Sequence, residues 1–487
     1  MADKDSSSFM RSLCMGQIEQ DILFPFPELA AEQKDTLHEI ASALQDLLGQ
    51  READFRQWDS DGDMPPEFLD QLREFGLFGL IVPEQHGGMG LGNMAYSRTL
   101  QEIGRYDASV AVTIGAHSSI GMRGLMLFGT EEQKARYLPR LATGELIAAF
   151  CLTEPGAGSD AAAVKTTAVR DGDDWVLNGN KLWITNGGFA DFFTVFARTH
   201  VEGVRGKMTA FIVTRDMDGV STGPHEDKMG LRASSTTTVL LDNVRVPETN
   251  VLGELGKGFK VAMQILNNGR TGLGGGSVGG MKHLIELATQ QANERKTFGE
   301  PIASYGLIKE KIGRMVVDCY TSEAVVTMVG GLIDAGYKEY AVEAAISKIY
   351  ATECLARSAD EALQIAGGNG YMREYPYERV VRDCRINRIF EGTNEILRLF
   401  TALTAMNDVA AELKELASSM RDVLHDPIKG FGVLSDYALK HAKLRTGRGE
   451  AARLQNLHEA IRPQAETFEL ETRYLARAAD RILRMHG

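Results

Sequence analysis

Hydrophobic and polar residues alternate at helical spacing over the first part of the chain, from about residue 29 to 146. In one segment the apolar residues recur at helical spacing, with polar residues between them, as in Leu37, Ile40, Leu44, Leu47 and Leu48. Residues at this spacing line one face of an α-helix, and that face can then be buried. The pattern predicts an N-terminal helical domain.

A different pattern begins near residue 147 and continues to about 251. Short runs rich in β-branched and aromatic residues, such as FFTVFA, MTAFIV and TTVLLDNVRV, are separated by Asp-Gly and Asn-Gly pairs. Such runs are typical of strands, and such pairs are typical of hairpin turns. We expect an antiparallel sheet domain of about 100 residues here.

Helical periodicity returns near residue 256, in segments far longer than ten residues, so helices are favoured over strands. A further helical segment follows residue 407 and is interrupted by a turn around DPIKGFG. The chain is therefore expected to be an α+β multidomain protein. Its expected parts are an N-terminal helical domain (25–146), a central antiparallel β domain (147–251), a C-terminal helical bundle (252–407) and an extra helical extension (408–487).

Composition narrows the class of protein. With 487 residues, 44% of them hydrophobic and 24% charged, the chain resembles ordinary globular proteins of several domains. No apolar run reaches the ~18 residues of a membrane span. The 53 basic and 66 acidic side chains give a net charge of −13. This charge would repel phosphate, so nucleic-acid binding is not expected.

Cysteine and histidine usage favours neither a disulfide framework nor a metal site. The 5 cysteines are scattered, and no CxxC or HExxH pattern occurs, so we expect a reducing compartment and no metal. The first residues, MADKDSSSFMR, lack the features of a secretory signal or transit peptide. We expect a cytoplasmic protein, as in a bacterium, or a mitochondrial matrix protein if this is a mature form.

A basic stretch lies near the end of the chain. Tyr437–Leu454 carries five basic residues and a single acidic residue. Such a run is usually a solvated helix face. In an acidic chain it also suits contact with an anionic membrane surface, where each basic residue contributes ~1 kcal/mol. We expect peripheral membrane contact through residues 437–454, at the inner membrane in a mitochondrion, with the solvated face as the alternative.

The segment Gly274–Gly279 formally satisfies both GxGxxG and GxSxG. Both motifs require a preceding strand, whereas VAMQILNNGR upstream has a helical pattern. We therefore expect a glycine-rich helix start whose backbone packs closely against a neighbouring element.

Two segments of the predicted β domain suit a ligand. In FCLTEPGAGSD, Gly156 and Gly158 allow close approach of the backbone, although a Pro-Gly turn between strands would have the same pattern. In LWIT, Trp183 and Thr185 lie two residues apart and hence on one side of a strand. This pair suits a flat aromatic cofactor, although tryptophan in a sheet core is equally ordinary.

Two glycine-bearing loops, QIAGGNGY and RIFEGTNE, interrupt the C-terminal helices. Glycine is destabilising there unless the backbone must bend or approach a ligand. Glu391 lies between Phe390 and Gly392. Apolar, flexible surroundings would raise its proton affinity, as a general base for a weakly acidic C–H requires. The alternative is a surface glutamate in a loop.

Together these segments resemble the acyl-CoA dehydrogenase family. The motifs that carry the resemblance, in chain order, are FCLTEPGAGSD, LWIT, ERKTFG, QIAGGNGYMREYPYERVVRD and RIFEGTNEI. The resemblance spans roughly residues 25–405. FPFPE, GAHSSIGMRGLMLFGT, ILNNGR and EILRLFTAL are most similar to the very-long-chain subgroup, although the C-terminal extension is shorter than in that subgroup.

The resemblance implies an FAD cofactor between the β domain and the second helical domain. The cofactor-binding residues it implies are Phe150, Leu152, Thr153, Gly158, Ser159, Trp183, Ile184, Thr185, Arg295, Thr297, Phe298, Gln364, Gly367, Gly368, Thr393, Asn394 and Glu395. In relatives, the segments matching Arg295 and Gln364 act across a subunit boundary. A homo-oligomer, at least a homodimer, is therefore implied.

The resemblance also implies that Glu391 is the catalytic base, which removes the α-proton of an acyl-CoA while the β-hydrogen leaves as hydride to the flavin. Some relatives carry the base one residue before an arginine matching Arg270, where this chain has Gly269, so Glu391 is assigned alone. The implied substrate-binding residues are Ser159, Asn267, Asn268, Arg270, Phe390, Gly392, Gly121 and Gly124.

Gly121 and Gly124 concern the length of the acyl chain. Two glycines three residues apart lie on one helix face, where they leave a groove. The resemblance implies that this groove opens the closed end of the acyl tunnel. Close helix packing is the alternative.

The implied activity is FAD-dependent dehydrogenation of long-chain or very-long-chain acyl-CoA, the first step of fatty-acid β-oxidation, with electrons passed to an electron-transfer flavoprotein. Two alternatives share the fold, an acyl-CoA oxidase that reduces O₂ and an assembly factor for a respiratory complex. The sequence leaves open the optimal chain length, the final electron acceptor and the choice between dimer and tetramer.

Overall fold

The computed structural model describes residues 8–422, 439 and 453–486. These residues form two compact units. The larger comprises Leu29–Gly330 and Ser347–Asn394, and the smaller comprises the described parts of Met1–Glu28, Gly331–Ile346 and Glu395–Gly487. Nearly all of the basic stretch 437–454 lies outside the described residues.

The N-terminal part of the larger unit is helical, as the sequence predicts. Ile40, Leu44 and Leu48 of the first long helix are buried in one core. Asp107 caps a later helix by accepting a hydrogen bond from the backbone N–H of Val110 at 2.9 Å. The helices are α3 (Ala31–Leu48), α4 (Glu52–Asp61), α5 (Pro66–Glu74), α6 (Asn93–Tyr106), α7 (Ala108–Gly115), a π-helical segment η2 (Ala116–Gly121), α8 (Arg123–Phe128) and α9 (Glu131–Ala142).

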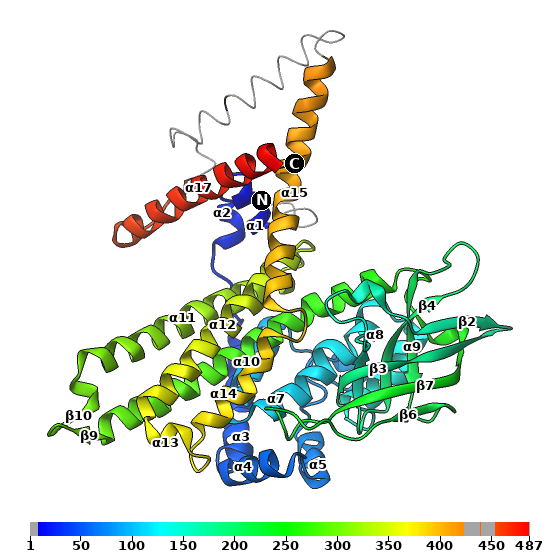
Figure 1. Cartoon of the computed structure of the whole chain (residues 1–487), viewed down its shortest axis with the longest axis horizontal. Coiled ribbons are helices and arrows are strands. Elements are labelled where there is room, and N and C mark those ends of the chain that lie inside the picture. The colour runs from blue at the N-terminus through cyan, green and yellow to red at the C-terminus, as the bar shows by residue number, and fades with distance from the viewer. Residues whose placement is uncertain (1–7, 423–438, 440–452, 487) are drawn as a thin grey trace. The chain divides into compact units, whose positions relative to one another are not determined.

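The β domain is one sheet of eight strands, seen in green in Figure 1. Its strands are β1 (Ala148–Cys151), β2 (Thr167–Asp171), β3 (Asp174–Thr185), β4 (Phe192–Thr199), β5 (Met208–Thr214), β6 (Val220–Thr222), β7 (Thr236–Pro247) and β8 (Val251–Leu252). The order is β6-β7-β3-β2-β4-β5-β8, and β1 pairs with β4. Most pairs are antiparallel, as expected, but β1 and β2 each pair with β4 in parallel. The sheet is therefore mixed.

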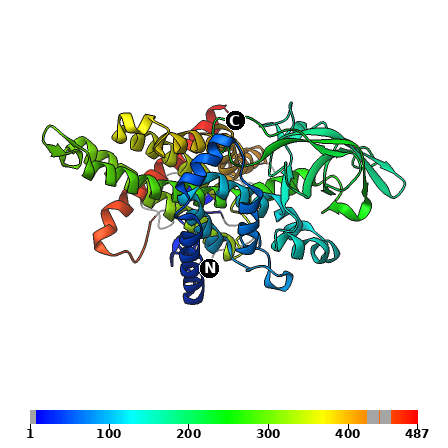
Figure 2. The same cartoon turned by 90° about the horizontal axis from the view of Figure 1, so that it is seen from below.

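Long helices follow the sheet, and Figures 1 and 2 show α10, α11 and α12 running side by side. Buried residues from all three, such as Met281, Met315 and Leu355, form a second core. The elements are α10 (Gly258–Glu294), a small hairpin of β9 (Lys296–Thr297) and β10 (Glu300–Pro301), α11 (Gly306–Asp334), α12 (Ala341–Ala366), α13 (Gly368–Tyr371), α14 (Tyr377–Arg385), the 3-10 turn η6 (Ile386–Arg388) and α15 (Asn394–Asp422). The expected fold class is confirmed.

The glycine-rich segment 274–279 lies inside α10 and does not begin a helix, so that expectation is wrong. Its close packing is present, however. A Cβ atom on Gly275 would lie 2.5 Å from the backbone oxygen of Ser97, and one on Gly279 would collide with the backbone oxygen of Gln101. Both neighbours belong to α6, so these glycines let the backbones of α10 and α6 approach closely.

Helix α11 is long and apolar enough to cross a membrane by length and composition alone. Three of its side chains, Met315, Cys319 and Val326, are buried in the second core. Core helices of globular proteins pass the same test, so this one helix is weak evidence for a membrane span.

The smaller unit joins both ends of the chain. Its helices include α1 (Phe9–Cys14), α2 (Gln20–Leu23) and α17 (Arg462–His486), and Leu13 and Ile18 share a small core with Leu454 and Ala465. The hydroxyl of Ser8 donates to the carboxylate of Glu343 at 2.7 Å. The described residues of the C-terminal extension are thus mainly helical.

Candidate functional site

The predicted base, Glu391, lies in the loop between η6 and α15. Its backbone φ is +55°, and Gly392 follows with a φ of +92°. A left-handed backbone is rare for a residue other than glycine and costs of order 1–3 kcal/mol. Such strain occurs preferentially at functional sites, where the surroundings fix the conformation.

The carboxylate of Glu391 lies directly over Gly269 of α10. A Cβ atom on Gly269 would be 3.1 Å from Oε2 and 3.4 Å from Oε1 of Glu391, and 2.8 Å from a methyl group of Ile120. The glycine therefore leaves the space in which the carboxylate fits. The predicted base and Gly269, where the sequence resemblance places the base of some relatives, therefore lie against each other.

Burial shapes the acidity of Glu391. Its Oε2 atom is buried and has no hydrogen-bond partner within the part of the chain that the structure describes. Burial raises the pKa of the carboxyl to about 7, while Arg270 and Lys348 oppose the rise. A carboxylate with a pKa near neutrality is suited to take a proton from carbon.

Lys348 of α12 holds this loop, although the sequence analysis did not single it out. Its side chain is fully buried, and its Nζ donates to the backbone oxygen of Gly392 at 2.9 Å and to Oδ1 of Asn394 at 2.8 Å. The amide nitrogen of Asn394 donates to Thr352 at 3.1 Å and to Glu353 at 2.9 Å. The sequence did contain a signal for this residue, because Lys348 lies on the apolar face of a helix. A charge in that position is buried only when it has a specific partner.

The predicted substrate segment of α10 lies beside the base. Arg270 is buried, and its Nη1 donates to Asn267 at 2.5 Å. Burial lowers the pKa of Arg270 to about 10, while Glu391 opposes the change, so the guanidinium stays charged at neutral pH. Oδ1 of Asn268 accepts from Arg123 at 3.0 Å.

The two motifs of the β domain lie beside each other. The backbone N–H of Leu182 donates to the backbone oxygen of Thr153 at 2.9 Å. Beneath them the buried Glu154 accepts from the fully buried Lys181 at 2.7 Å. Although burial favours the neutral acid, the ion pair with Lys181 holds the pKa of Glu154 below its usual range.

Trp183 has an unusual conformation for a residue of a strand. Its φ is +56°, and a bulge breaks the pairing of β3 with β7 between Lys181 and Ile184. Simple strand alternation is therefore interrupted here. Its side chain is 62% exposed, so it is not a core tryptophan. A large apolar ring held outward by a bulge offers a flat surface to a ligand.

Comparison with known proteins decides the family. The family models described as "Acyl-CoA dehydrogenase, N-terminal domain", "middle domain" and "C-terminal domain" match residues 32–145, 149–244 and 256–405. The chain belongs to the acyl-CoA dehydrogenase family. It is 45% identical to the human very long-chain specific acyl-CoA dehydrogenase, mitochondrial, over 98% of this chain and 73% of that protein. It is 44% identical to a probable acyl-CoA dehydrogenase of Bacillus subtilis, over 77% of this chain and 67% of that protein.

Solved structures agree with this membership. The acyl-CoA dehydrogenase of Bacillus anthracis complexed with FAD is 35% identical, with a TM-score of 0.75, over 99% of this chain and 84% of that one. Butyryl-CoA dehydrogenase of Megasphaera elsdenii is also 35% identical, with a TM-score of 0.74, over 78% of this chain and 100% of that one. The chain is an FAD-dependent acyl-CoA dehydrogenase.

The residues of this acyl-CoA dehydrogenase fit the cofactor. Trp183 exposes its ring, and Cβ atoms on Gly156 or Gly158 would meet nothing within 4 Å, so the loop leaves open space above its backbone. Thr153 and Thr185 are only partly buried. An aromatic face beside an open glycine loop with hydroxyl groups suits a flavin ring and its polar edge.

Most of the predicted cofactor residues that follow the β domain are exposed. Phe298 of the β9–β10 hairpin is 94% exposed and has a φ of +50°. Gly367 and Gly368, at the end of α12, are exposed, as are Gln364 and Glu395. Asn394 is instead fully buried and bonded to Lys348, Thr352 and Glu353.

Gly121 and Gly124 are both tightly packed. Gly121 ends the π-helical segment, and a Cβ on it would lie 2.8 Å from backbone and side-chain atoms of Ala148. A Cβ on Gly124 would lie 2.9 Å from Ile265 and 3.0 Å from Leu252, at the ends of their side chains. These contacts favour the close-packing alternative, and the role in chain length stays a prediction.

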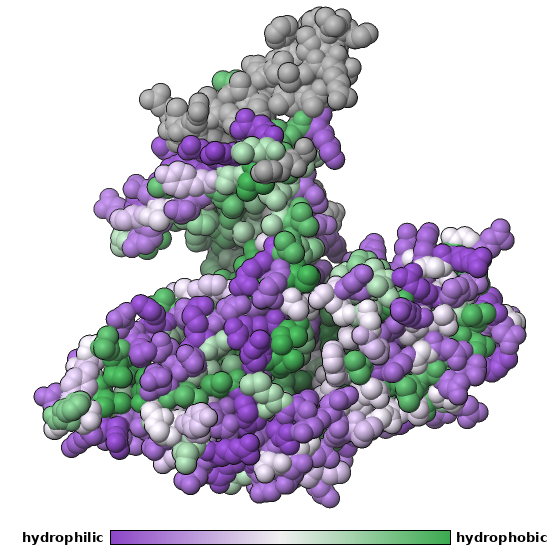
Figure 3. Space-filling view, in the orientation of Figure 1, coloured by the Kyte–Doolittle hydropathy of each residue, from purple (hydrophilic) through white to green (hydrophobic). Residues whose placement is uncertain are grey.

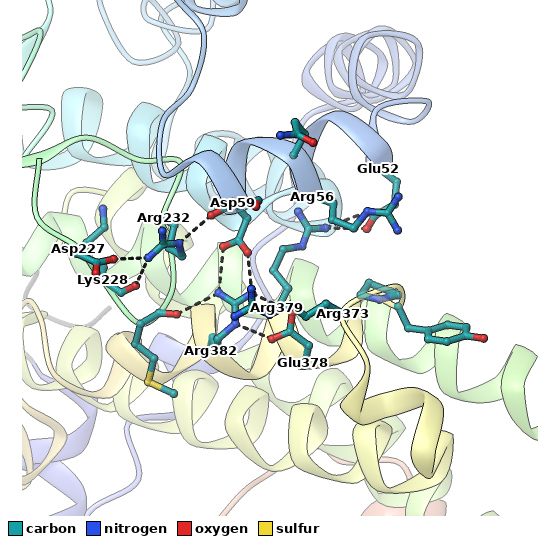
Figure 4. Close-up of a pocket in the computed structure, with 15 residues that line it drawn as sticks. Glu52, Arg56, Asp59, Asp227, Lys228, Arg232, Arg373, Glu378, Arg379 and Arg382 are labelled. Carbon is teal, nitrogen blue, oxygen red and sulfur yellow. Dashed lines mark hydrogen bonds and ion pairs between the residues drawn. The ribbon is translucent and has the colours of Figure 1, made fainter.

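A polar cavity of about 700 Å³ lies away from Glu391, between α4, residues 227–232 and the region of α14 (Figure 4). Its charged residues mostly pair with one another. Arg382 bonds to Asp59 at 2.7 Å and to Glu378 at 2.6 Å, and Arg379 bonds to Glu52 at 3.0 Å. This network ties together the helical and β parts of the larger unit.

Within the described residues no cluster of His, Cys, Asp and Glu could hold a metal.

Proposed function

We propose that this enzyme oxidises long-chain or very-long-chain acyl-CoA to trans-2-enoyl-CoA, with Glu391 as the base. The observation that carries the proposal is the buried carboxylate of Glu391 over Gly269, with a pKa near 7. Bound FAD supplies the acceptor for the hydride that leaves the β-carbon.

Glu391 acts on the α-proton. An α-proton of a thioester is too weakly acidic for an ordinary carboxylate. Burial strengthens Glu391 as a base, and its backbone N–H is proposed to polarise the thioester carbonyl, as an oxyanion hole does. The proton moves from the α-carbon to the carboxylate, and Arg270 keeps a positive charge beside it.

The residues proposed to hold the cofactor are those that the sequence analysis assigns. The β-domain residues, Trp183 foremost, receive the flavin ring. Lys181 supports the loop from below through Glu154 and the backbone oxygen of Phe196, at 2.7 Å in each case. The hairpin at Arg295 and the loop at Gln364 are proposed to hold the remainder of the FAD of a partner subunit.

The preference for long acyl chains rests on similarity. The human and Macaca fascicularis relatives, 45% and 46% identical, are named very long-chain specific and mitochondrial. Acyl-CoA dehydrogenases of Bacillus subtilis are also similar. We therefore propose a long-chain substrate and a location in either the mitochondrial matrix or the bacterial cytoplasm.

An electron-transfer flavoprotein is the proposed electron acceptor. A solved structure from work on the electron transferring flavoprotein of Acidaminococcus fermentans is 35% identical, with a TM-score of 0.74 over 78% of this chain. The oxidase alternative also has a structural relative, the prolyl acyl carrier protein oxidase AnaB, at 30% identity. Reduction of a dye by reduced enzyme without formation of peroxide supports the dehydrogenase.

A second copy of the chain is proposed as a partner, in a homodimer. Large apolar side chains are exposed on α11 and on the hairpin before it. Phe298, between β9 and β10, is 94% exposed, and Leu307 and Tyr320 of α11 are 75% and 73% exposed. Apolar surface is visible over the end of the helical domain that carries β9 and β10 (Figure 3). Large exposed apolar side chains are typical of surfaces that another subunit covers.

Membrane contact through 437–454 is proposed from its charge alone. Each basic residue contributes ~1 kcal/mol near an anionic surface, and salt weakens the attachment. The full-length enzyme should bind anionic vesicles at low salt, and a variant lacking this stretch should not. If neither protein binds, the stretch is a solvated face.

The most direct test of the substrate is anaerobic titration of the yellow enzyme with saturated acyl-CoAs of increasing length. Bleaching of the flavin by long acyl chains at the lowest concentrations supports the proposal. A preference for short chains would contradict it.

A further inference from the structure

The loop of Glu391 is held from behind by a buried cation. Two consecutive residues, Glu391 and Gly392, have left-handed backbones. Such a conformation persists only where the surroundings fix it. The carbonyl oxygen of Gly392 accepts from Nζ of Lys348 at 2.9 Å, so one hydrogen bond joins the strained peptide to helix α12.

The donor is itself fixed in place. Lys348 and Asn394 are both fully buried, and Nζ of Lys348 lies 2.8 Å from Oδ1 of Asn394. Asn394 is anchored in turn to Thr352, one helical turn after Lys348, at 3.1 Å. A charge-assisted hydrogen bond in a dry interior is stronger than one at the surface, so this arrangement suits a rigid support.

We propose that Lys348 is a positioning residue for Glu391: its ammonium group fixes the loop through Gly392 and Asn394 and places a positive charge near the carboxylate. The inference rests on the proposed role of Glu391 as the base and adds a residue to that site. A buried lysine is costly unless its charge is hydrogen-bonded, and Gly392 and Asn394 supply those bonds here.

The charged and titratable groups around the carboxylate come from three helices. Arg270 of α10 and Lys348 of α12 both lower the pKa of Glu391, and burial raises it. Burial raises the pKa of the phenol of Tyr96 on α6, and the charge of Glu391 raises it further, so Tyr96 stays neutral. Removing Lys348 leaves Arg270 as the cation that faces Glu391 among these groups.

The test uses the holoenzyme with Lys348→Gln and Lys348→Met. Glutamine removes the charge but keeps a donor for Gly392, whereas methionine removes both. Lys282→Met is the matched control, because Lys282 is a partly buried lysine of α10 that bonds to Gln101 and Glu323 instead. The carboxyl infrared band of Glu391, identified by its absence in Glu391→Gln, is titrated in each protein.

The proposal predicts that the midpoint of this band rises by about one pH unit or more in both Lys348 variants and stays unchanged in Lys282→Met. The acid limb of kcat/KM should shift by the same amount, a tenfold loss per unit below the limb. The maximal rate should fall further in Lys348→Met than in Lys348→Gln, since only glutamine can replace the bond to Gly392.

An unchanged midpoint in Lys348→Gln, with the protein folded and flavin bound, overturns the proposal even if the rate falls, because lost packing alone lowers the rate without moving the band. Should Lys348→Met not fold, Lys348→Gln decides. Failure of the base assignment is separate, since it appears as normal activity in Glu391→Gln.

Discussion

The carboxylate of Glu391 packs against Gly269. A Cβ atom on this glycine would lie 3.1 Å from Oε2 of Glu391. This relationship links a loop that precedes α15 to the middle of α10. A side chain at position 269 would therefore limit the space that the carboxylate of Glu391 occupies.

The first prediction concerns the space beside Glu391. Gly269→Ala should lower kcat/KM by about 10-fold to 10²-fold, because the added methyl group displaces the carboxylate and small misplacements are costly. Gly276→Ala is the matched control on the same helix, where the nearest atom to a Cβ is 4.0 Å away. Steady-state kinetics with a long-chain acyl-CoA measures both. Equal activity in the two variants would show that the contact does not constrain the base.

The pH dependence of the reaction follows from the same burial. The pKa of Glu391 is raised to about 7, and the base must be ionised to accept a proton. We expect kcat/KM to increase tenfold per pH unit below about pH 7 and to level off above it. A profile that is flat from pH 5 to 8 would contradict a buried base.

Stability should show the opposite pH dependence. The pKa of Glu391 is raised on folding, from an ordinary value of 4.5 to about 7, so ionisation destabilises the folded enzyme. Its stability relative to Glu391→Gln should be highest below pH 4.5 and should fall as the pH rises through 7. The loss should reach at most about 3 kcal/mol. Chemical denaturation of both proteins across this range measures it, and a constant difference would contradict the burial.

Gly121 and Gly124 should respond differently to alanine. The nearest atoms to a Cβ on Gly121 belong to the backbone and Cβ of Ala148, which cannot move easily, whereas those near Gly124 end flexible side chains. Gly121→Ala should cost about 1–3 kcal/mol, as overpacking does, and Gly124→Ala less. Thermal unfolding checks this order. If Gly124→Ala also shifts kcat/KM toward shorter acyl-CoAs, the tunnel ends at this glycine, and an unchanged profile places its end elsewhere.

Periodicity predicts which segments of the chain are helical and which form the sheet. Apolar spacing predicts the burial of Ile40, Leu44 and Leu48, and β-rich runs predict the sheet. The parallel pairing of β1 and β2 with β4 could not be predicted, because pairing depends on how distant segments meet. The position of the glycines of 274–279 inside a helix could not be predicted either. The reason for these glycines is close packing against α6, which lies about 180 residues earlier in the chain.

The site was predictable only in part. The position of Glu391 in a glycine-bearing loop indicates a base, but the contact with Gly269 and the support from Lys348 depend on tertiary structure. The left-handed backbone of Trp183 likewise arises from a bulge that strand alternation does not reveal. The effect of residues such as Gly269 and Lys348 on Glu391 arises through tertiary contacts and is not revealed by the local sequence pattern.

The central claim is that Glu391 takes the α-proton, and rapid mixing of the oxidised enzyme with a long-chain acyl-CoA under anaerobic conditions tests it most directly. Glu391→Gln keeps the size of the side chain but cannot accept the proton. The rate of flavin bleaching should fall by about 10²–10⁴-fold, with the flavin still bound and the acyl-CoA still binding. Bleaching at a rate close to that of the unmodified enzyme would contradict the account.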